Sequence, residues 1–184
     1  MNKIEQKVAS LSSSPSDINE HLNTLASYAK KCEHVTELGV RWVVSTWALA
    51  SGNPKKLRSY DIQHPNNQGG GDSFNQLLEA ISETSIDFTF TEADDLTIEI
   101  EETDLLFIDT WHVYDQLKKE LELHGNKARK YIIFHDTVTF GEHGEGGGVG
   151  LMPAINEFLE SNHNWEIEKH FLNNNGLMIL KRLK

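Results

Sequence analysis

Short apolar runs that each end in or beside a carboxylate are the feature that most constrains the fold of this chain. They are VTELG with Glu37, LRSYD with Asp61, DLLFID with Asp109 and YIIFHD with Asp136. Apolar runs separated by helix-length segments indicate parallel strands buried on both faces of a doubly wound sheet. Ligands of such sheets bind beyond the carboxyl ends of the strands. We therefore expect the four carboxylates to converge on one edge of the sheet.

The remaining segments complete this fold. IDFTF predicts one more strand, and WEIEKHF and GLMILKRL predict two strands joined by LNNNG, whose Asn-Gly pair favours a tight hairpin turn. The sequence therefore predicts an α/β protein with a doubly wound, mostly parallel seven-stranded sheet, helices on both faces and a C-terminal antiparallel hairpin. We expect one domain over residues 1–184, in which residues 1–16 form a flexible or helical N-terminal extension.

Two helix starts are predicted from capping residues. Asp17 is followed three residues later by Glu20, a spacing typical of a capping box at the start of the helix that precedes the first strand. Asp72 or Ser73 is expected to cap the helix that contains FNQLLEAISET.

Charge and cysteine content exclude several classes of function. The chain has 17 basic and 28 acidic residues and a formal charge of -11, which disfavours binding to a phosphate backbone, so we expect no nucleic-acid partner. Cys32 is the only cysteine, which excludes an internal disulfide and predicts a buried thiol. The first residues lack the apolar region of a signal peptide and no membrane-length apolar run follows. The expectation is a soluble, cytoplasmic protein with no membrane partner.

Taken in order, these segments resemble the class I S-adenosylmethionine-dependent methyltransferases. The resemblance runs from about Asp17 to the C-terminus. Within this class the chain is similar to a small single-domain type that includes cephalosporin-hydroxylase-like and macrolide-sugar O-methyltransferases. It implies a Rossmann-like methyltransferase fold and S-adenosylmethionine as cofactor. The segments that carry it are VTELGVRWVVSTW, LRSYDI, LLFIDTWHVYDQLKKEL, YIIFHDT and GVGLMPAINEFL.

The resemblance also implies which residues bind the cofactor. The loop after the first strand would wrap the methionine part, a carboxylate after the second strand would accept hydrogen bonds from both ribose hydroxyls, and an acidic residue after the third strand would lie near the adenine. For Asp61 the alternative is a turn-forming role. Glu92 and Asp95 compete with Asp94 for the position near the adenine, and a solvated acidic turn is the alternative. The implied residues are Glu37, Gly39, Ser45, Thr46, Asp61 and Asp94.

The first loop departs from the family pattern. Arg41 and Val43 stand where the family usually has small residues. The carboxylate of S-adenosylmethionine can be held by hydroxyls and amides at a helix start. The alternative is a catalytically degenerate binding module that keeps the fold.

Three side chains at the ends of neighbouring strands form the predicted metal site. Asp109, His135 and Asp136 would offer oxygen and nitrogen donors, and the family carries an acidic pair where His135 and Asp136 stand. Oxygen-rich sites suit magnesium, whereas a histidine ligand favours manganese, iron or zinc. The alternative is a set of hydrogen-bonded helix caps. The expected cofactors are S-adenosylmethionine and a divalent metal such as magnesium or manganese.

The expected reaction is metal-assisted O-methylation of a hydroxyl on a sugar or another small molecule. Asp109 and His112 are the predicted catalytic residues, because a neutral imidazole of ordinary pKa at His112 would accept the hydroxyl proton. A hydrogen-bonded helix-start residue is the alternative for His112. A metal-dependent hydrolase or oxygenase that uses Asp109, His135 and Asp136 is the alternative activity. The partner is a small-molecule substrate, and a homo-oligomer is left open.

Overall fold

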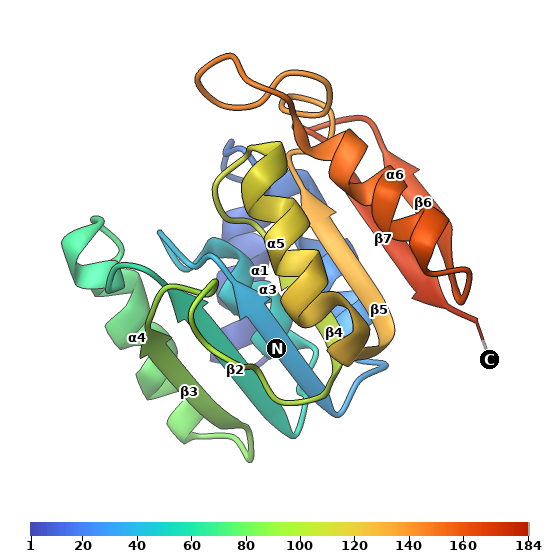
Figure 1. The fold of residues 1–184 in the computed structure, drawn as a ribbon. Coiled ribbons are helices and arrows are strands. Elements are labelled where there is room, and N and C mark those ends of the chain that lie inside the picture. Colours follow the sequence, from blue (N-terminus) through green and yellow to red (C-terminus); the bar gives the residue numbers. More distant parts are fainter. Residues whose placement is uncertain (184) are drawn as a thin grey trace.

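The computed structural model describes residues 1–183 and contains one seven-stranded sheet. Its strands are β1 (His34–Leu38), β2 (Lys56–Asp61), β3 (Asp87–Glu92), β4 (Thr103–Ile108), β5 (Ala128–His135), β6 (Trp165–Phe171) and β7 (Leu177–Arg182). They lie in the order β3-β2-β1-β4-β5-β7-β6 (Figure 1). β1 to β5 are parallel, and β7 pairs antiparallel with β5 and β6. The predicted doubly wound sheet with a C-terminal hairpin is confirmed.

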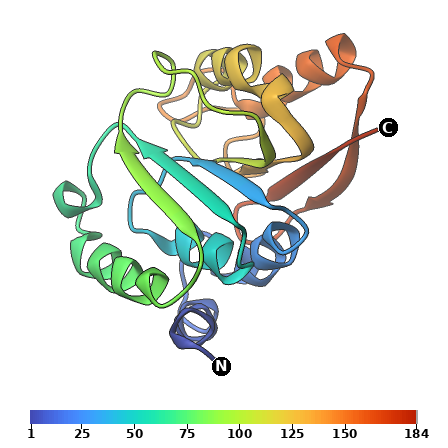
Figure 2. The same ribbon diagram turned by 90° about the horizontal axis from the view of Figure 1, so that it is seen from below.

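Helices cover both faces of the sheet (Figure 2). α1, α2, α3 and α4 lie on one face, and α5 and α6 contact each other on the other. Residues 1–16 contain α1, which packs on α3 and α4. Within residues 1–183, no helix combines the length and apolar character needed to cross a membrane. The helices are α1 (Lys3–Ser12), α2 (Leu22–Ala29), α3 (Val44–Ser51), α4 (Gly71–Ser82), α5 (Tyr114–His124) and α6 (Leu151–Ser161).

The hydrophobic core is divided by the sheet into two clusters. Successive side chains of a strand point to opposite faces, so Phe107 packs in the cluster under α1 to α4 and Leu106 packs under α5 and α6. Trp47 of α3 is buried in the first cluster. Cys32 lies in the same cluster as a free, buried thiol, as predicted.

The strand register brings three of the four predicted carboxylates to one edge, whereas Glu37 lies within β1 and is buried. Leu38 pairs with Tyr60 on one side and with Ile108 on the other, and Ile108 pairs with Phe134. The residues that follow these positions therefore leave the sheet side by side. This places Asp61, Asp109 and Asp136 at the carboxyl edge of the sheet, as the sequence predicted.

Both predicted capping interactions are wrong. The helix before β1 starts at Leu22, after a short 3₁₀ turn (Asn19–His21), and no side chain caps it. Asp17 lies exposed before this turn, where its carbonyl oxygen is 3.1 Å from His135 Nε2. α4 is preceded by Gly70 and also has no side-chain cap, and Asp72 lies inside its first turn. At Asp17 the long-range contact with His135 replaces the predicted local capping motif.

The turn between β6 and β7, residues 173–176, joins three separate parts of the chain. Asn174 Oδ1 accepts a hydrogen bond of 2.9 Å from the Glu20 amide, in the segment before α2. The carbonyl oxygen of Asn175 accepts one of 2.9 Å from the Val138 amide, in the connection between β5 and α6. Asn174 and Asn175 have φ values of 44° and 68°, the left-handed region that asparagine tolerates. The C-terminal hairpin thus holds the N-terminal segment beside the end of β5.

Candidate functional site

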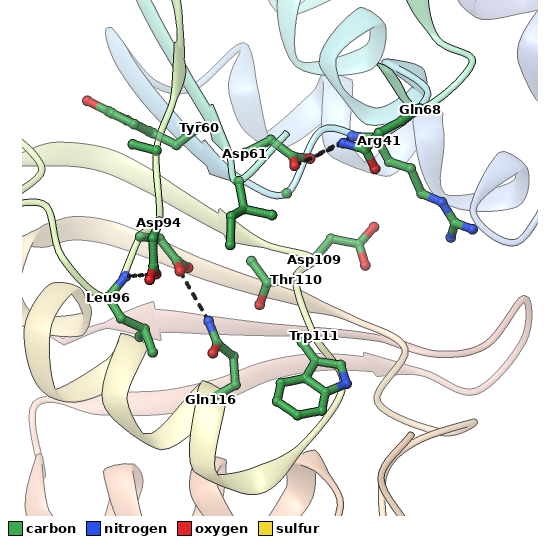
Figure 3. A pocket seen from close by; sticks show the side chains of 14 residues that line it. Arg41, Tyr60, Asp61, Gln68, Asp94, Leu96, Asp109, Thr110, Trp111 and Gln116 are labelled. Carbon is green, nitrogen blue, oxygen red and sulfur yellow. Dashed lines mark hydrogen bonds between the residues drawn. The ribbon is translucent and has the colours of Figure 1, made fainter. Parts of the chain in front are cut away.

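The carboxyl ends of the strands border a cavity of about 430 Å³ (Figure 3). Its walls come from the segments that follow β1, β2, β3 and β4. Gly39, Asp61, Asp94 and Asp109 line it. Four of the residues expected at a cofactor or catalytic site therefore face one space, although they come from four different loops.

Gly39 is required by the close approach of the first loop to the end of β4. Its φ is +88°, and a Cβ at this position would lie 1.9 Å from the carbonyl oxygen of Asp109. Its amide donates a hydrogen bond of 2.9 Å to the carbonyl oxygen of Tyr60. Only glycine satisfies both the left-handed backbone and the missing space.

Arg41 and Val43 keep a glycine-like backbone. Their φ values are 42° and 69°, in the left-handed region that disfavours L side chains by about 1–2 kcal/mol per residue. Val43 is fully buried, and the Arg41 guanidinium lies 3.9 Å from the centre of the Trp42 ring. The departure in residue type therefore leaves the left-handed turns of the loop in place.

Asp61 supports the first loop with one oxygen. Its Oδ2 accepts hydrogen bonds of 2.8 Å from the Val40 amide and 2.9 Å from the Arg41 amide. Its Oδ1 accepts bonds of 2.9 Å from the Gln63 amide and 3.0 Å from Gln68 Nε2. All acceptor positions of the carboxylate are thus engaged by the protein, three by backbone amides and one by a side chain.

Glu37 lies beneath the loop and is fully buried. Its two oxygens accept hydrogen bonds of 2.6 Å from the hydroxyls of Ser45 and Ser59. Burial raises the pKa of Glu37 to about 7, although the hydroxyl donors oppose this shift. Ser45 and Thr46, at the start of α3, are buried beside it. The structure thus places Glu37 and Ser45 as internal support for the loop.

Asp94 caps its own turn, with Oδ1 accepting a hydrogen bond of 2.9 Å from the Leu96 amide. The neighbouring Asp95 is buried and also lines the cavity. Its carboxyl group faces that of the fully buried Glu120, and burial together with the nearby Asp95 carboxylate raises the pKa of Glu120 well above its usual range. Gln116 Nε2 donates to both carboxyl groups, over 3.1 Å to Asp95 and 2.8 Å to Glu120.

A second, smaller cavity of about 90 Å³ adjoins the first. The two share Gly39, Arg41, Asp109 and Thr110 in their walls. Asp17 also faces the smaller one, a residue that the sequence placed only as a cap.

Asp109, His112 and Asp136 form a compact group in the wall of the smaller cavity. His112 Nε2 lies 2.9 Å from Asp136 Oδ2 and 3.4 Å from Asp109 Oδ1. One ligand atom from each residue lies within 4.8 Å of the others. His112, predicted only as a base, is therefore the nitrogen donor of this group.

His135 contacts the same two carboxylates from the buried side. Its Nδ1 lies 3.3 Å from Asp109 Oδ1 and 3.4 Å from Asp136 Oδ2. Its Nε2 lies 3.1 Å from the carbonyl oxygen of Asp17, which fixes a proton on Nε2. The structure thus brings all three predicted metal ligands together and adds His112.

The two carboxylates change the protonation of both histidines. Burial alone lowers the pKa of His112, but hydrogen bonds with Asp109 and Asp136 outweigh it and raise the pKa to about 10. The negative charge of Asp109 likewise outweighs burial and raises the pKa of His135 to about 11. His112 thus does not have the ordinary pKa that its expected role as a base assumed.

The group fits a divalent cation. Asp136 Oδ1 is buried and has no hydrogen-bond partner within residues 1–183, whereas buried polar atoms in proteins are normally partnered. Asp136 has a φ of 60°, a conformation that is uncommon outside glycine and clusters at active sites and ligand-binding sites. A mixed set of carboxylate oxygens and imidazole nitrogen suits manganese, iron or zinc better than magnesium.

No protein-family model matches the chain, and no curated protein matches it. Solved structures do match over its whole length. The O-methyltransferase from Bacillus cereus in complex with SAH has a TM-score of 0.67 and 14% identity, and the match covers 99% of this chain and 91% of that one. A putative O-methyltransferase from Klebsiella pneumoniae has a TM-score of 0.67 and 14% identity, with 100% and 91% covered.

The match extends to an enzyme of a different acceptor class. The N-methyltransferase NodS from Bradyrhizobium japonicum, in complex with S-adenosyl-L-homocysteine, has a TM-score of 0.65 and 13% identity, with 100% of both chains covered. At these identities the similarity establishes the fold, and it covers enzymes that methylate oxygen and nitrogen. The chain therefore has the fold of the class I S-adenosylmethionine-dependent methyltransferases.

Proposed function

We propose that this protein is an S-adenosylmethionine-dependent methyltransferase that methylates a hydroxyl of a small molecule with the help of a divalent cation. The observation that carries the proposal is the adjacency of the two cavities, which share Gly39, Arg41, Asp109 and Thr110. Methyl transfer depends mainly on holding the donor and the acceptor in line. Adjoining cavities of unequal size, with an imidazole–carboxylate group beside the smaller one, suit this requirement.

The larger cavity is the proposed cofactor site. Of the four donors to Asp61, only Gln68 Nε2 belongs to a side chain. A ribose hydroxyl would replace Gln68 at Asp61 Oδ1, while Oδ2 keeps the loop amides in place. The left-handed backbone at Arg41 and Val43 supports cofactor binding over the alternative of a degenerate module, because the loop retains the shape that small residues would give it.

The smaller cavity is the proposed acceptor site. Asp109, Asp136 and His112 would hold the cation, with His135 behind them. A bound cation lowers the pKa of a coordinated hydroxyl and orients it. Asp17 and Arg41 line the same space and offer an acceptor and a donor of hydrogen bonds to a polyhydroxylated molecule such as a sugar.

His112 Nε2 has two candidate roles that exclude each other. A protonated imidazole accepts no proton. The raised pKa keeps His112 protonated at neutral pH in the cation-free protein. The base predicted from the sequence therefore operates only at high pH in the cation-free protein. The position of Nε2 between two carboxylates supports the ligand role when a cation enters.

The choice of oxygen as acceptor rests on the residues of this chain, since the fold alone also occurs in an N-methyltransferase. Carboxylates and an imidazole beside the acceptor cavity suit activation of a hydroxyl. The metal-dependent hydrolase or oxygenase alternative uses the same group but leaves the larger cavity, lined by Gly39 and Asp61, without a ligand.

Titration of S-adenosylhomocysteine by calorimetry, with and without Mn²⁺, tests the proposal. Asp61→Asn should weaken binding at least tenfold, because an amide cannot accept from both the loop and the ribose. Asp72→Asn is the matched control, since Asp72 is an exposed carboxylate on α4 that lines neither cavity. Transfer of a labelled methyl group to a panel of sugars then tests the acceptor class.

The outcomes separate the alternatives. Failure to bind S-adenosylhomocysteine under any cation condition would contradict the proposal and favour the degenerate module. Binding of Mn²⁺ without binding of S-adenosylhomocysteine would favour the hydrolase or oxygenase.

A further inference from the structure

The glycine-rich loop between β5 and α6, residues 141–150, contacts His112 through Glu145. Glu145 Oε2 lies 3.2 Å from His112 Nδ1. The Glu145 amide also donates a hydrogen bond of 2.9 Å to the carbonyl oxygen of His112. Side chain and backbone of one loop residue thus hold the ring and the backbone of the same histidine.

Neighbouring residues of the loop fix this attachment. The Phe140 ring stacks on the His112 ring, with centroids 4.7 Å apart and planes 6° from parallel. A Cβ on Gly144 would lie 2.9 Å from the carbonyl oxygen of His112 and 2.7 Å from that of Val149. The backbone can therefore approach His112 closely only because residue 144 is glycine.

The following glycines are free of such contacts. Gly146 and Gly147 have φ values of +80° and +93°, and a Cβ on either would meet nothing within 4 Å. Gly148 is equally open. The tip of the loop thus stands away from the protein, while Glu145 on one side and Val149 on the other, whose carbonyl oxygen accepts a hydrogen bond of 3.0 Å from the Tyr114 amide, join the loop to the segment around His112.

The contact with Glu145 also selects the nitrogen that His112 presents. An ionised carboxylate only accepts hydrogen bonds, so His112 Nδ1 carries the hydrogen that faces Glu145. In a neutral imidazole the lone pair is then on Nε2, which lies between Asp109 and Asp136. A histidine that binds a cation commonly donates its other ring N–H to a carboxylate in this way.

We propose that Glu145 is a positioning residue that directs His112 Nε2 toward the cation, so that cation binding and the order of the loop at residues 144–149 are coupled. This inference rests on the cation site of the proposed function. Loss of the Glu145 carboxylate would leave His112 Nδ1 without its acceptor and remove the side-chain contact of the loop with the ring, while the backbone bond from residue 145 to His112 stays. A cation would in turn hold His112 still and, through it, the amide of Glu145.

Manganese binding, measured as free Mn²⁺ by electron paramagnetic resonance, tests the proposal without any enzymatic assay. Glu145→Ala should weaken Mn²⁺ binding by about ten- to a hundredfold, the usual effect of removing such a partner. Glu145→Gln should retain part of the affinity, because its amide oxygen still accepts from Nδ1. Glu142→Ala is the matched control, since it removes an exposed carboxylate from the same loop whose side chain makes no hydrogen bond within residues 1–183.

Hydrogen exchange provides the second readout. Mn²⁺ should slow hydrogen exchange of the backbone amide of residue 145 in the native protein and in the Glu142→Ala variant. It should not slow exchange of this amide in the Glu145→Ala variant. Equal Mn²⁺ affinity of Glu145→Ala and Glu142→Ala would overturn the proposal, as would an unchanged exchange rate in the native protein. Native protein that binds S-adenosylhomocysteine but no Mn²⁺ would overturn the role of Glu145 and leave methyl transfer standing. Native protein that binds Mn²⁺ but no S-adenosylhomocysteine would instead overturn the proposal that the protein is a methyltransferase.

Discussion

Gly39 lies so close to Asp109 that a Cβ on Gly39 would stand 1.9 Å from the Asp109 carbonyl oxygen. The first and fourth strand ends are thus in backbone contact at the centre of the site, where Gly39 and Asp109 line both cavities. The separation of the two cavities is therefore set at this point by backbone atoms, which side-chain motion does not relax.

Gly39→Ala should destabilise the protein by about 3 kcal/mol, because the new methyl group forces two backbone segments apart. Gly69→Ala provides the control, since its φ of +81° is similar but its Cβ would meet nothing within 4 Å. The control should cost about 1 kcal/mol, the strain of a left-handed alanine. Urea unfolding measures both, and equal losses would contradict the close contact.

Glu37 should make stability fall as pH rises. Its pKa is raised to about 7 in the folded protein from 4.5, so the folded state holds a proton that the unfolded state releases. The contribution of this proton to the free energy of unfolding is fully present below pH 4.5 and is lost as the pH rises through about 7, a change of about 3 kcal/mol. The Glu37→Gln variant has no titrating carboxyl group at this position and so lacks this pH dependence. The stability of the variant relative to the native protein, measured by urea unfolding, should therefore rise between pH 4 and pH 8, and a constant difference would contradict the prediction.

Cation binding should release protons. The pKa of His112 is raised to about 10, so a cation at neutral pH must displace a proton from Nε2. The apparent association constant for Mn²⁺ should therefore rise about tenfold per pH unit from pH 7 to pH 9. Calorimetry in buffers of different ionisation enthalpy counts the released protons. Affinity that is independent of pH would show that His112 is not a ligand.

Glu120 should tolerate glutamine but not alanine. The raised pKa keeps the Glu120 carboxyl neutral beside Asp95, where it accepts hydrogen bonds from Thr110 and Gln116, and the neutral amide of glutamine can accept the same bonds. Glu120→Gln should change the free energy of unfolding by less than about 1 kcal/mol, whereas Glu120→Ala should cost about 3 kcal/mol through the cavity and the unpaired groups. Thermal unfolding of the two variants compares them. Equal losses would show that the proton between Glu120 and Asp95 has no structural role.

Much of the fold follows from the sequence because its strands are buried on both faces. Runs such as YIIFHD carry the signal of a central strand, and strand ends of a parallel sheet share one edge, so the meeting of Asp61, Asp109 and Asp136 could be predicted. The Asn-Gly pair correctly indicated the closing hairpin between Phe171 and Leu177.

The errors and omissions arise from contacts between distant residues. The predicted cap at Asp17 failed because the segment around it binds His135 and the turn at Asn174 instead. The Asp95–Glu120 pair joins a loop to the inner face of α5, and the contact of Glu145 with His112 depends on how a glycine-rich loop folds back. Local periodicity carries no information about either contact.

The turn at residues 173–176 has a consequence for the order in which the protein is made. Glu20 and Asn174 are bonded across 154 residues of sequence. During synthesis on a ribosome the segment before α2 emerges first, whereas the turn that anchors it is translated about 150 residues later. His135 and the end of β5 therefore acquire their final neighbours only after that turn has been translated, and until then the carboxyl edge of the sheet stays open on this side.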